Sequence, residues 1–272
     1  MLNVIIDEIG VSVDAGFLSV AGAELEYYFY FADPDRKEFP TLVFLHEGLG
    51  SSALWRDIPQ RIRAELGGPA MLVYSRAGYG KSTPVKDDRP VTYMHSEGLD
   101  VLPLVLDALK IERPILVGHS DGGSIALIHA GAGHPVSALV LIAPHVIVED
   151  QSIAGIAAAR ETFLATDLSE KMEKYHADAE STFWGWNRVW LSPEFRDWNI
   201  EEYLPTIDAP ILVIQGDMDE YGTLAQLDLI ERGVAGEVTR QIVEGAKHSP
   251  HLQSTAEVVE AVSKFLSQFI EA

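Results

Sequence analysis

Pro114-Ile115-Leu116-Val117-Gly118-His119-Ser120-Asp121-Gly122-Gly123 is the stretch around which this chain is organised. A short apolar run leads into a Gly-x-Ser-x-Gly turn, and an apolar helix is expected from Ser124 to about Ala132. A serine in such a strand-to-helix turn carries its hydroxyl clear of the backbone. The helix behind it directs N–H groups at the place where negative charge develops during acyl transfer. The strand and helix on either side make this short motif informative.

The overall composition suits one large α/β domain, with or without an insertion. The chain has 272 residues, 47% of them hydrophobic, and no linker-like segment divides it. Lys and Arg number 20 against 41 Asp and Glu, so the formal net charge is −21. Such a surface repels nucleic acid and anionic membranes, and we expect a small-molecule substrate instead. The sequence leaves open whether the chain forms a homo-oligomer.

Several kinds of site are not expected in this chain. It has no cysteine, which excludes disulfides, thiol catalysis and cysteine metal sites. No cluster of His, Asp and Glu has metal-ligand spacing, so we expect neither a metal nor another cofactor. The first eight residues lack the basic start of a signal peptide, and no apolar run approaches the roughly 20 residues that span a bilayer. A soluble, cytoplasmic protein is the expectation.

Apolar runs of strand length alternate with helical patterns along the chain. Two β-branched and aromatic runs within residues 3–32 predict antiparallel strands at the start. Further strands are predicted at residues 41–45, 70–74, 114–117, 138–143, 210–214 and 239–243. Their alternation with helices predicts a parallel sheet covered on both faces, with ligands beyond the C-terminal strand ends. Pro103, inside a helical pattern over residues 93–110, predicts a kink or a later start of that helix.

The strand pattern stops at Pro144 and resumes at Pro210. Between them lie helical segments at 152–165, 168–179 and 193–204, with four of the five tryptophans. We interpret residues 145–205 as a helical lid over the strand ends, inserted into a core formed by residues 1–144 and 206–272. Most of the aromatic side chains are expected to pack this lid against the core, and one or two to line an apolar pocket. The candidates for pocket residues are His145, Trp184 and Trp186.

A serine hydroxyl is a weak nucleophile at neutral pH, so Ser120 needs a base and an acid that orients the base. The later strand ends supply two acids, Asp217 and Asp219, and two histidines, His248 and His251. The chain order serine, acid, histidine is the one expected for this type of turn. From the residues alone, both choices stay open.

Four motifs together resemble the α/β-hydrolase superfamily, lidded serine hydrolases in particular, over nearly the whole chain. They are Leu-His-Glu-Gly-Leu-Gly at 45–50, Gly-His-Ser-Asp-Gly-Gly at 118–123, Gln-Gly-Asp-Met-Asp at 215–219 and Gly-Ala-Lys-His-Ser-Pro at 245–250. The resemblance implies a mostly parallel eight-stranded sheet flanked by helices, with the lid inserted after the sixth strand. It also implies Ser120 as nucleophile, His248 as base and Asp219 as the orienting acid.

The resemblance further implies an oxyanion hole made by the backbone N–H groups of Gly48 and Asp121. Glu47 departs from the family, which commonly has glycine there, and its carboxylate opposes a developing negative charge unless it points away or is paired. The loop over residues 75–82 also departs, because it lacks the family's Asp and Arg. Arg76 in this loop is a candidate to pair with Glu47 or to contact substrate, and the alternative is an ordinary surface arginine.

Three functions follow as hypotheses. The first is a serine hydrolase that cleaves a small to medium, largely apolar carboxylic ester through an acyl-enzyme. The second is a carbon–carbon bond hydrolase of the meta-cleavage type with the same triad, whose substrate carboxylate would need Arg76, Arg160 or Arg188 as a partner. The third is a ligand receptor on this fold without turnover. A serine nucleophile argues against the dehalogenase and epoxide-hydrolase branches, which use aspartate.

Overall fold

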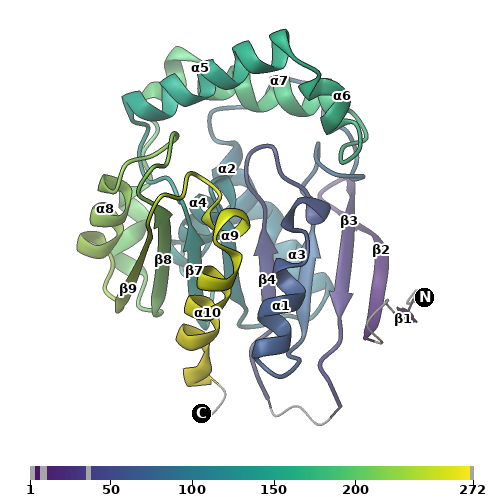
Figure 1. Cartoon of the computed structure of the whole chain (residues 1–272). Helices are drawn as coiled ribbons and strands as arrows, with labels where there is room; N and C mark the ends of the chain where they lie inside the picture. The colour runs from purple at the N-terminus through teal and green to yellow at the C-terminus, as the bar shows by residue number, and fades with distance from the viewer. Residues whose placement is uncertain (1–3, 7–10, 35–37, 270–272) are drawn as a thin grey trace.

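One twisted sheet forms the centre of the protein in the computed structural model, which describes residues 4–6, 11–34 and 38–269 (Figure 1). Its strands lie in the order β1 (Val4–Ile6), β2 (Ser12–Val20), β3 (Ala23–Tyr30), β5 (Met71–Tyr74), β4 (Leu42–Leu45), β6 (Ile115–His119), β7 (Ala138–Ile142), β8 (Ile211–Gly216) and β9 (Val238–Val243). Pairing is antiparallel from β1 to β5 and parallel from β5 to β9. The predicted mostly parallel sheet is confirmed. It has nine strands in the described residues rather than eight, because the short β1 adds to the edge of β2.

The central strands are short and fully buried, which explains their continuous apolar sequences. In β4, Leu42 and Phe44 face one side of the sheet while Val43 and Leu45 face the other. Each set joins a separate apolar core, one on each face of the sheet. Because both faces are buried, these strands do not alternate apolar with polar residues.

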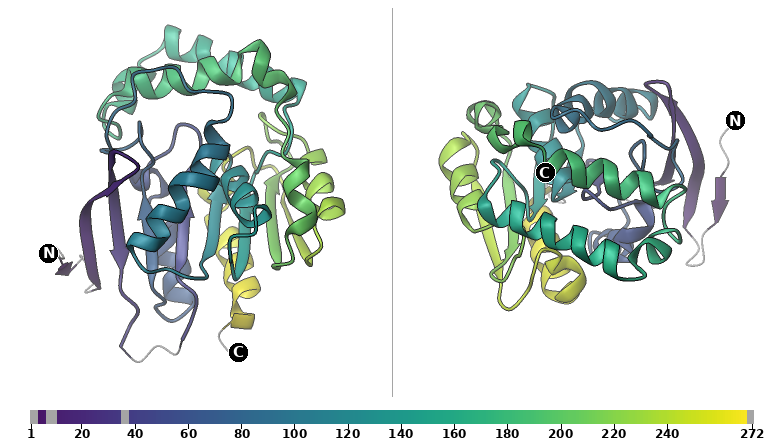
Figure 2. Two further views of the ribbon diagram at one scale, coloured as in Figure 1. Left: turned by 180° about the vertical axis from the view of Figure 1, so that it is seen from behind. Right: turned by 90° about the horizontal axis from the view of Figure 1, so that it is seen from above.

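Helices cover both faces of the sheet (Figure 2). One face packs against α1 (Ile58–Glu65), α9 (Pro250–Gln253) and α10 (Thr255–Leu266). The other packs against α2 (Tyr93–Ser96), α3 (Leu102–Ala108), α4 (Asp121–Gly131) and α8 (Ala225–Gly233). No helix within the described ranges is both long enough and apolar enough to cross a membrane.

The helical stretch over residues 93–108 changes from α to π geometry ahead of its proline. A π turn at Glu97–Val101 separates α2 from α3. Proline has no N–H for the carbonyl four residues earlier, and the π turn contains that residue, Leu99. The turn lies close to α4, since a Cβ on Gly98 would be 3.0 Å from the carbonyl oxygen of Ile125.

A separate helical layer lies above the C-terminal edge of the sheet (Figures 1 and 2). It consists of α5 (Asp150–Ala165), α6 (Leu168–Met172) and α7 (Ala179–Trp190), followed by 3-10 turns η3 (Pro193–Asp197) and η4 (Glu201–Thr206). Stacked rings of Phe163 and Phe183, 3.8 Å apart, join α5 to α7. The helix expected over residues 168–179 ends at Met172, because Asp178 caps a new helix by accepting the N–H of Ser181 at 2.9 Å.

Candidate active site

Ser120 occupies the sharp turn between β6 and α4 that its sequence predicts. Its φ is 52°, in the left-handed region that non-glycine residues rarely adopt. The turn fits only because its neighbours are small: a Cβ on Gly122 would lie 1.9 Å from the carbonyl oxygen of Leu45. A Cβ on Gly118 would lie 2.3 Å from the carbonyl oxygen of Gly122. The strained turn lifts the hydroxyl above the sheet.

Three side chains from distant parts of the chain form one hydrogen-bonded row. Nε2 of His248 lies 2.9 Å from Oγ of Ser120, and Nδ1 lies 2.9 Å from both carboxylate oxygens of Asp219. Asp219 follows β8 and His248 follows β9, so parallel strands bring them to the same sheet edge as Ser120. Proton transfer from the hydroxyl to the imidazole is therefore geometrically available.

The other acid and the other histidine lie elsewhere. Asp217 is exposed, and its carboxylate accepts the N–H of Gly245 at 2.6 Å. His251 is buried and packs against Trp55, with 5.3 Å between ring centroids. The sequence left open the choice between two acids and between two histidines, and only Asp219 and His248 lie in the row with Ser120.

The buried carboxyl of Asp219 is held in its ionised form. Burial by itself raises its pKa, but the hydrogen bond and charge of His248, together with the N–H of Tyr221, outweigh burial and lower the pKa below its ordinary value. The carboxylate accepts N–H groups of Tyr221 at 2.8 Å and Gly222 at 3.3 Å. An ionised acceptor at Nδ1 keeps the ring proton there and leaves the Nε2 lone pair facing Ser120.

Two free backbone donors lie next to Ser120. Asp121 is the first residue of α4, so its N–H has no partner within the helix. Gly48 lines the same cavity, on the loop after β4. Neither N–H donates a hydrogen bond to another residue in the described ranges. These are the two groups that the sequence proposed for an oxyanion hole.

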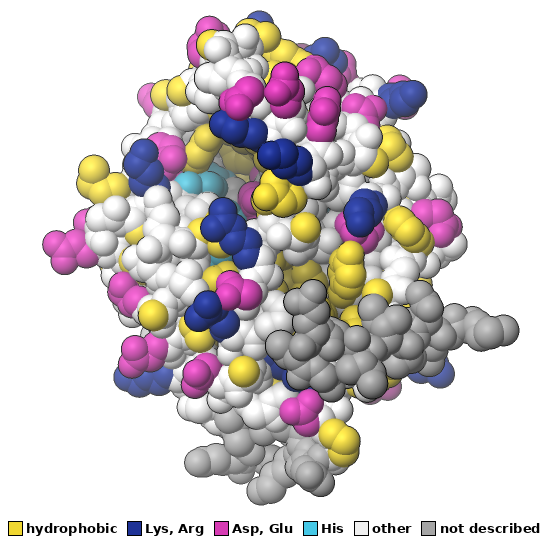
Figure 3. All heavy atoms as spheres, turned by 45° about the vertical axis from the view of Figure 1, so that its right-hand side comes forward, with side chains coloured by type: hydrophobic (Ala, Val, Ile, Leu, Met, Phe, Trp, Pro, Cys, Tyr) yellow, Lys and Arg dark blue, Asp and Glu magenta, His cyan; other side chains and the backbone are white. Residues whose placement is uncertain are grey.

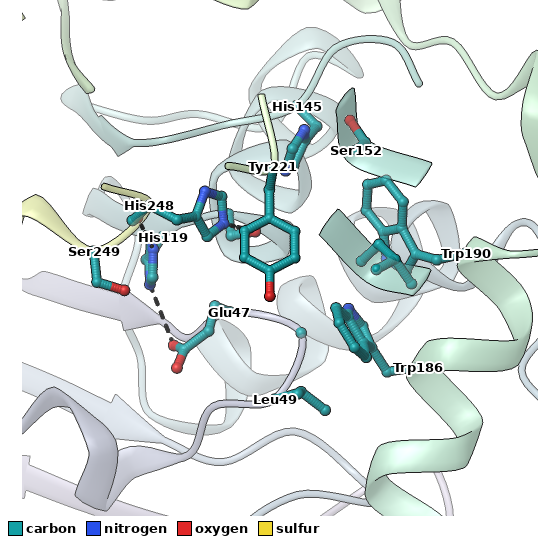
Figure 4. Close-up of a pocket in the computed structure, with 13 residues that line it drawn as sticks. Glu47, Leu49, His119, His145, Ser152, Trp186, Trp190, Tyr221, His248 and Ser249 are labelled. Atoms are coloured by element: carbon teal, nitrogen blue, oxygen red, sulfur yellow. Dashed lines mark hydrogen bonds and ion pairs between the residues drawn. The ribbon is translucent and has the colours of Figure 1, made fainter. Parts of the chain in front are cut away.

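A cavity of about 110 Å³ opens beside Ser120, beneath the upper helical layer (Figure 4). In the space-filling view, histidine side chains are visible in a hollow below that layer (Figure 3). The lining residues are mostly apolar or aromatic: Glu47, Gly48, Leu49, His119, Ser120, His145, Ser152, Ile156, Trp186, Trp190, Tyr221, His248 and Ser249.

Of the three predicted pocket residues, His145 and Trp186 line this cavity and Trp184 does not. Positions two apart on a helix face nearly opposite directions, whereas positions four apart share a face. Trp190 therefore joins Trp186 at the cavity, and the indole N–H of Trp184 instead donates to Glu180 at 2.9 Å. The four-residue spacing of these two tryptophans was the signal that could have identified Trp190.

His145 is a neutral imidazole in the cavity wall. Burial, helped by the nearby charge of His248, lowers its pKa to about 3. Its ring lies 5.1 Å from that of Trp190 and 5.6 Å from that of His248. The sequence prediction missed Tyr221, which lines the cavity and whose ring lies 4.8 Å from that of His248. Tyr221 lies two residues after the acid, but no pattern marked it.

Glu47 turns its carboxylate away from Trp186 and towards His119, with 3.4 Å between Oε2 and Nδ1 (Figure 4). Burial alone raises the pKa of this carboxyl, but the interaction with His119 and the charge of His46 hold it well below its usual value. Gly50 leaves space for the Glu47 carboxylate, because a Cβ at position 50 would lie 2.3 Å from Oε2 of Glu47. The carboxylate therefore points away, which is one of the two conditions set for Glu47.

Arg76 is buried beneath this loop, not on the surface. Its Nη2 donates to the main-chain carbonyl of Glu47 at 3.0 Å, rather than pairing with the carboxylate. The expected side-chain pair and the surface position are both wrong, because the rings of His46 and Tyr79 enclose the guanidinium. Arg76 is also absent from the cavity lining, so it makes no substrate contact there.

The loop after β5 has a carboxylate partner even though it lacks the family's Asp. Glu26 on β3 accepts the hydroxyl of Ser75 at 2.9 Å, the hydroxyl of Ser52 at 3.1 Å and the N–H of Lys81 at 3.1 Å. Gly80 lies against the same group, since a Cβ there would be 2.5 Å from Oε2 of Glu26. The acid is supplied by a different strand, and a glutamate beside the aromatic residues of β3 was its only signal.

Comparison with known proteins agrees with this geometry. The sequence profile described as "Alpha/beta hydrolase family" matches residues 42–261. The chain belongs to the alpha/beta hydrolase family. Among residues in the described ranges, no group of three or more His, Asp or Glu side chains is arranged to hold a metal ion.

Curated relatives in this family are similar over most of their length. A "Proline iminopeptidase" from Lactobacillus crispatus (strain ST1) is 26% identical, with 86% of this chain and 92% of that protein covered. The human "Serine hydrolase BPHL" is also 26% identical, covering 94% and 88%. A solved structure of a hydrolase from Pseudomonas aeruginosa PA01 superposes with a TM-score of 0.70 at 20% identity, covering 93% and 98%. Together with the family match, the relatives support a serine hydrolase of the alpha/beta hydrolase family.

Proposed function

We propose that this protein hydrolyses a small to medium, largely apolar carboxylic ester through an acyl-enzyme on Ser120. The observation that carries the proposal is the row Ser120–His248–Asp219, with each contact at 2.9 Å, at the wall of a mostly apolar cavity. Serine, a base and an ionised orienting acid in this order are what nucleophilic acyl transfer requires.

In the proposed mechanism, Oγ of Ser120 attacks the ester carbonyl carbon while its proton passes to Nε2 of His248. The N–H groups of Gly48 and Asp121 stabilise the oxyanion of the tetrahedral intermediate. The C–O bond to the alcohol breaks as the imidazolium returns the proton to that oxygen, leaving the acyl group on the serine. Water then attacks the acyl-enzyme with His248 as base, and the acid leaves as Ser120 regains its proton.

The size and lining of the cavity favour a short acyl group. Protein cavities of about 150 Å³ accommodate benzene, and this one measures about 110 Å³. Trp186, Trp190 and Ile156 descend on it from α5 and α7, so we propose that residues 145–205 act as its lid. The small volume and the apolar side chains from α5 and α7 both favour a substrate with a few apolar carbons on the acyl side.

Carbon–carbon bond hydrolysis is less well supported, because its substrate carboxylate would need a cation. Arg76, Arg160 and Arg188 are all absent from the cavity lining, and Glu47 with its carboxylate is present instead. Arg160 and Arg188 lie over the ring of Trp184, at 5.9 and 5.6 Å. None of the lining residues is a lysine or arginine that could pair with a substrate carboxylate.

A peptidase acting on a terminal amine is the second candidate. Glu47 lines the cavity, and the carboxylate of Glu220 accepts the backbone N–H of His248 at 3.2 Å, so two acids lie at or near the site. Such a rim suits a substrate with a positively charged amine, and several curated relatives carry the name proline iminopeptidase. The same row of residues would cleave an amide by the same steps.

Three chromogenic assays separate these reactions: a p-nitrophenyl butyrate ester, proline p-nitroanilide and a ring-cleavage dienoate. The ester proposal expects multiple turnover on the first and at most slow reaction on the others. Faster reaction on the anilide would favour the peptidase, and binding without turnover on any substrate would favour a receptor. Labelling with a fluorophosphonate, followed by peptide mapping, must identify Ser120, and a label on another residue would refute the mechanism.

A further inference from the structure

Arg76 is a buried cation without a role in the mechanism above. It follows β5 by two residues, its side chain is 0% exposed, and its backbone N–H donates to Nε2 of His46 at 3.0 Å. Placing a guanidinium in the interior is costly unless its donors are well matched. The groups it contacts therefore indicate what it does.

Its contacts run to both halves of the proposed oxyanion hole. On one side, Nη2 donates to the carbonyl of His46 at 3.2 Å and to the carbonyl of Glu47 at 3.0 Å. On the other side, the same nitrogen lies 3.9 Å from Oδ2 of Asp121. The guanidinium thus lies between the loop after β4 and the first residue of α4.

The carbonyl of Glu47 and the N–H of Gly48 belong to the same peptide group. A trans peptide is planar, and its C=O and N–H point in opposite directions. The carbonyl is held by Arg76 and by Nδ1–H of His46 at 2.7 Å. Fixing the carbonyl on the buried side therefore directs the Gly48 N–H the other way, towards the cavity that Gly48 lines.

The side chain of Asp121 is anchored in the same place. Its Oδ2 accepts the hydroxyl of Tyr93 at 2.6 Å, and that hydroxyl in turn accepts the indole N–H of Trp190 at 3.0 Å. Burial raises the pKa of this carboxyl, and the positive charge of Arg76, 3.9 Å away, opposes that rise. Anchoring the side chain restrains the backbone of Asp121, which carries the second free N–H.

We propose that Arg76 is a positioning residue that fixes the two N–H donors of the oxyanion hole, those of Gly48 and Asp121, relative to each other. The proposal rests on the proposed function, because it assigns Gly48 and Asp121 to that hole. It predicts that losing the guanidinium weakens stabilisation of the tetrahedral intermediate more than it weakens substrate binding.

The test compares Arg76→Met with Arg89→Met. The Arg89 guanidinium also lies over the Tyr79 ring, at 4.4 Å against 4.8 Å for Arg76, and its Nη2 donates to Ala77 in the same loop. The loop after β4 is not among its hydrogen-bond partners within the described ranges, so Arg89→Met controls for loss of a nearby cation. The readouts are kcat and KM on the best ester, and the second-order rate of fluorophosphonate labelling, which also places a phosphoryl oxygen in the hole.

We expect Arg76→Met to lower kcat and the labelling rate by about 10- to 100-fold, less than complete removal of an oxyanion donor, with KM within about threefold. Arg89→Met should change each value by less than about threefold, because Arg89 donates no hydrogen bond to the loop after β4 in the described ranges. The proposal would be overturned if the two variants had equal kcat and equal labelling rates, or if Arg76→Met changed only KM.

Arg76→Met leaves the buried Asp121 carboxyl without the guanidinium 3.9 Å away, which could unfold the chain. The double variant with Asp121→Asn removes that charge and keeps the backbone N–H. The proposal expects thermal stability to recover relative to the single variant while the labelling rate stays low. Recovery of both would assign Arg76 a structural role only.

Failure of the proposed function can be told apart from failure of this inference. If wild type is labelled at Ser120 but turns over no ester, the ester proposal fails, and the labelling rates of the variants still decide the role of Arg76. If Ser120 of wild type is not labelled, both proposals fall.

Discussion

Replacing Asp219 by asparagine is a sharp test of the proposed triad, because the surrounding donors dictate how the new amide must sit. Oδ1 accepts the N–H groups of Tyr221 and Gly222, so the amide oxygen would take that place. The amide NH₂ would then take the place of Oδ2, 2.9 Å from Nδ1 of His248, and the amide oxygen would stay at the same distance from Nδ1. Because the NH₂ donates towards Nδ1, we expect the ring proton to shift to Nε2, and a protonated Nε2 facing Ser120 can no longer accept the serine proton.

The expected loss is large and falls on kcat. A wrong histidine tautomer with intact geometry lowers kcat by about 10⁴-fold in serine proteases, equivalent to roughly 5.4 kcal/mol of transition-state stabilisation. KM should stay within about threefold, since Asp219 is not among the cavity-lining residues. The new NH₂ also faces Nε2 of Gln215, which donates to Oδ2 at 3.2 Å, so we expect a stability loss of about 1–3 kcal/mol.

The assay is steady-state ester hydrolysis, together with urea unfolding to confirm that the variant is folded. Asp217→Asn is the matched control, because Asp217 precedes Asp219 by two residues, is exposed and can still accept the N–H of Gly245 through an amide oxygen. It should keep activity within about twofold, as exposed substitutions usually do. An Asp219→Asn enzyme with more than a tenth of wild-type activity, or an equal loss in the control, would refute the tautomer reasoning.

Three further outcomes follow from the structure. Ser120→Ala should reduce ester hydrolysis to background while the thermal midpoint changes by no more than a few degrees; retained turnover would exclude Ser120 as nucleophile. Gly122→Ala should destabilise the fold severely, seen as loss of the cooperative melt, because its Cβ would lie 1.9 Å from the carbonyl oxygen of Leu45. Burial lowers the pKa of His129 to about 4, so the unfolded chain binds the extra proton as pH falls below about 6.5 and stability drops. Between pH 7 and 5 this costs about 2 kcal/mol, and urea unfolding of His129→Asn should show a pH dependence smaller by that amount.

Much of the fold and of the reactive row was predictable because the relevant signals are local. Short all-apolar runs mark strands buried on both faces, and strands of a parallel sheet end at the same edge, where Ser120, Asp219 and His248 follow β6, β8 and β9. The Gly-x-Ser-x-Gly turn is equally local, because steric crowding admits only small neighbours around Ser120. The choice of Asp219 over Asp217, however, came from family resemblance and not from any pattern in the residues.

The sequence by itself determined the strands of the sheet and their alternation with helices along the core, the tight turn that carries Ser120 and the acidic, cysteine-free composition, since each depends on residues that are neighbours along the chain. Only the tertiary structure decided which tryptophan faces the cavity, where Glu47 turns its carboxylate and that Arg76 is buried. It also decided that Glu26, from another strand, serves the loop that lacks its own acid. These side chains are directed by packing partners tens of residues away, and a burial or a hydrogen bond across that separation leaves no periodic trace in the sequence.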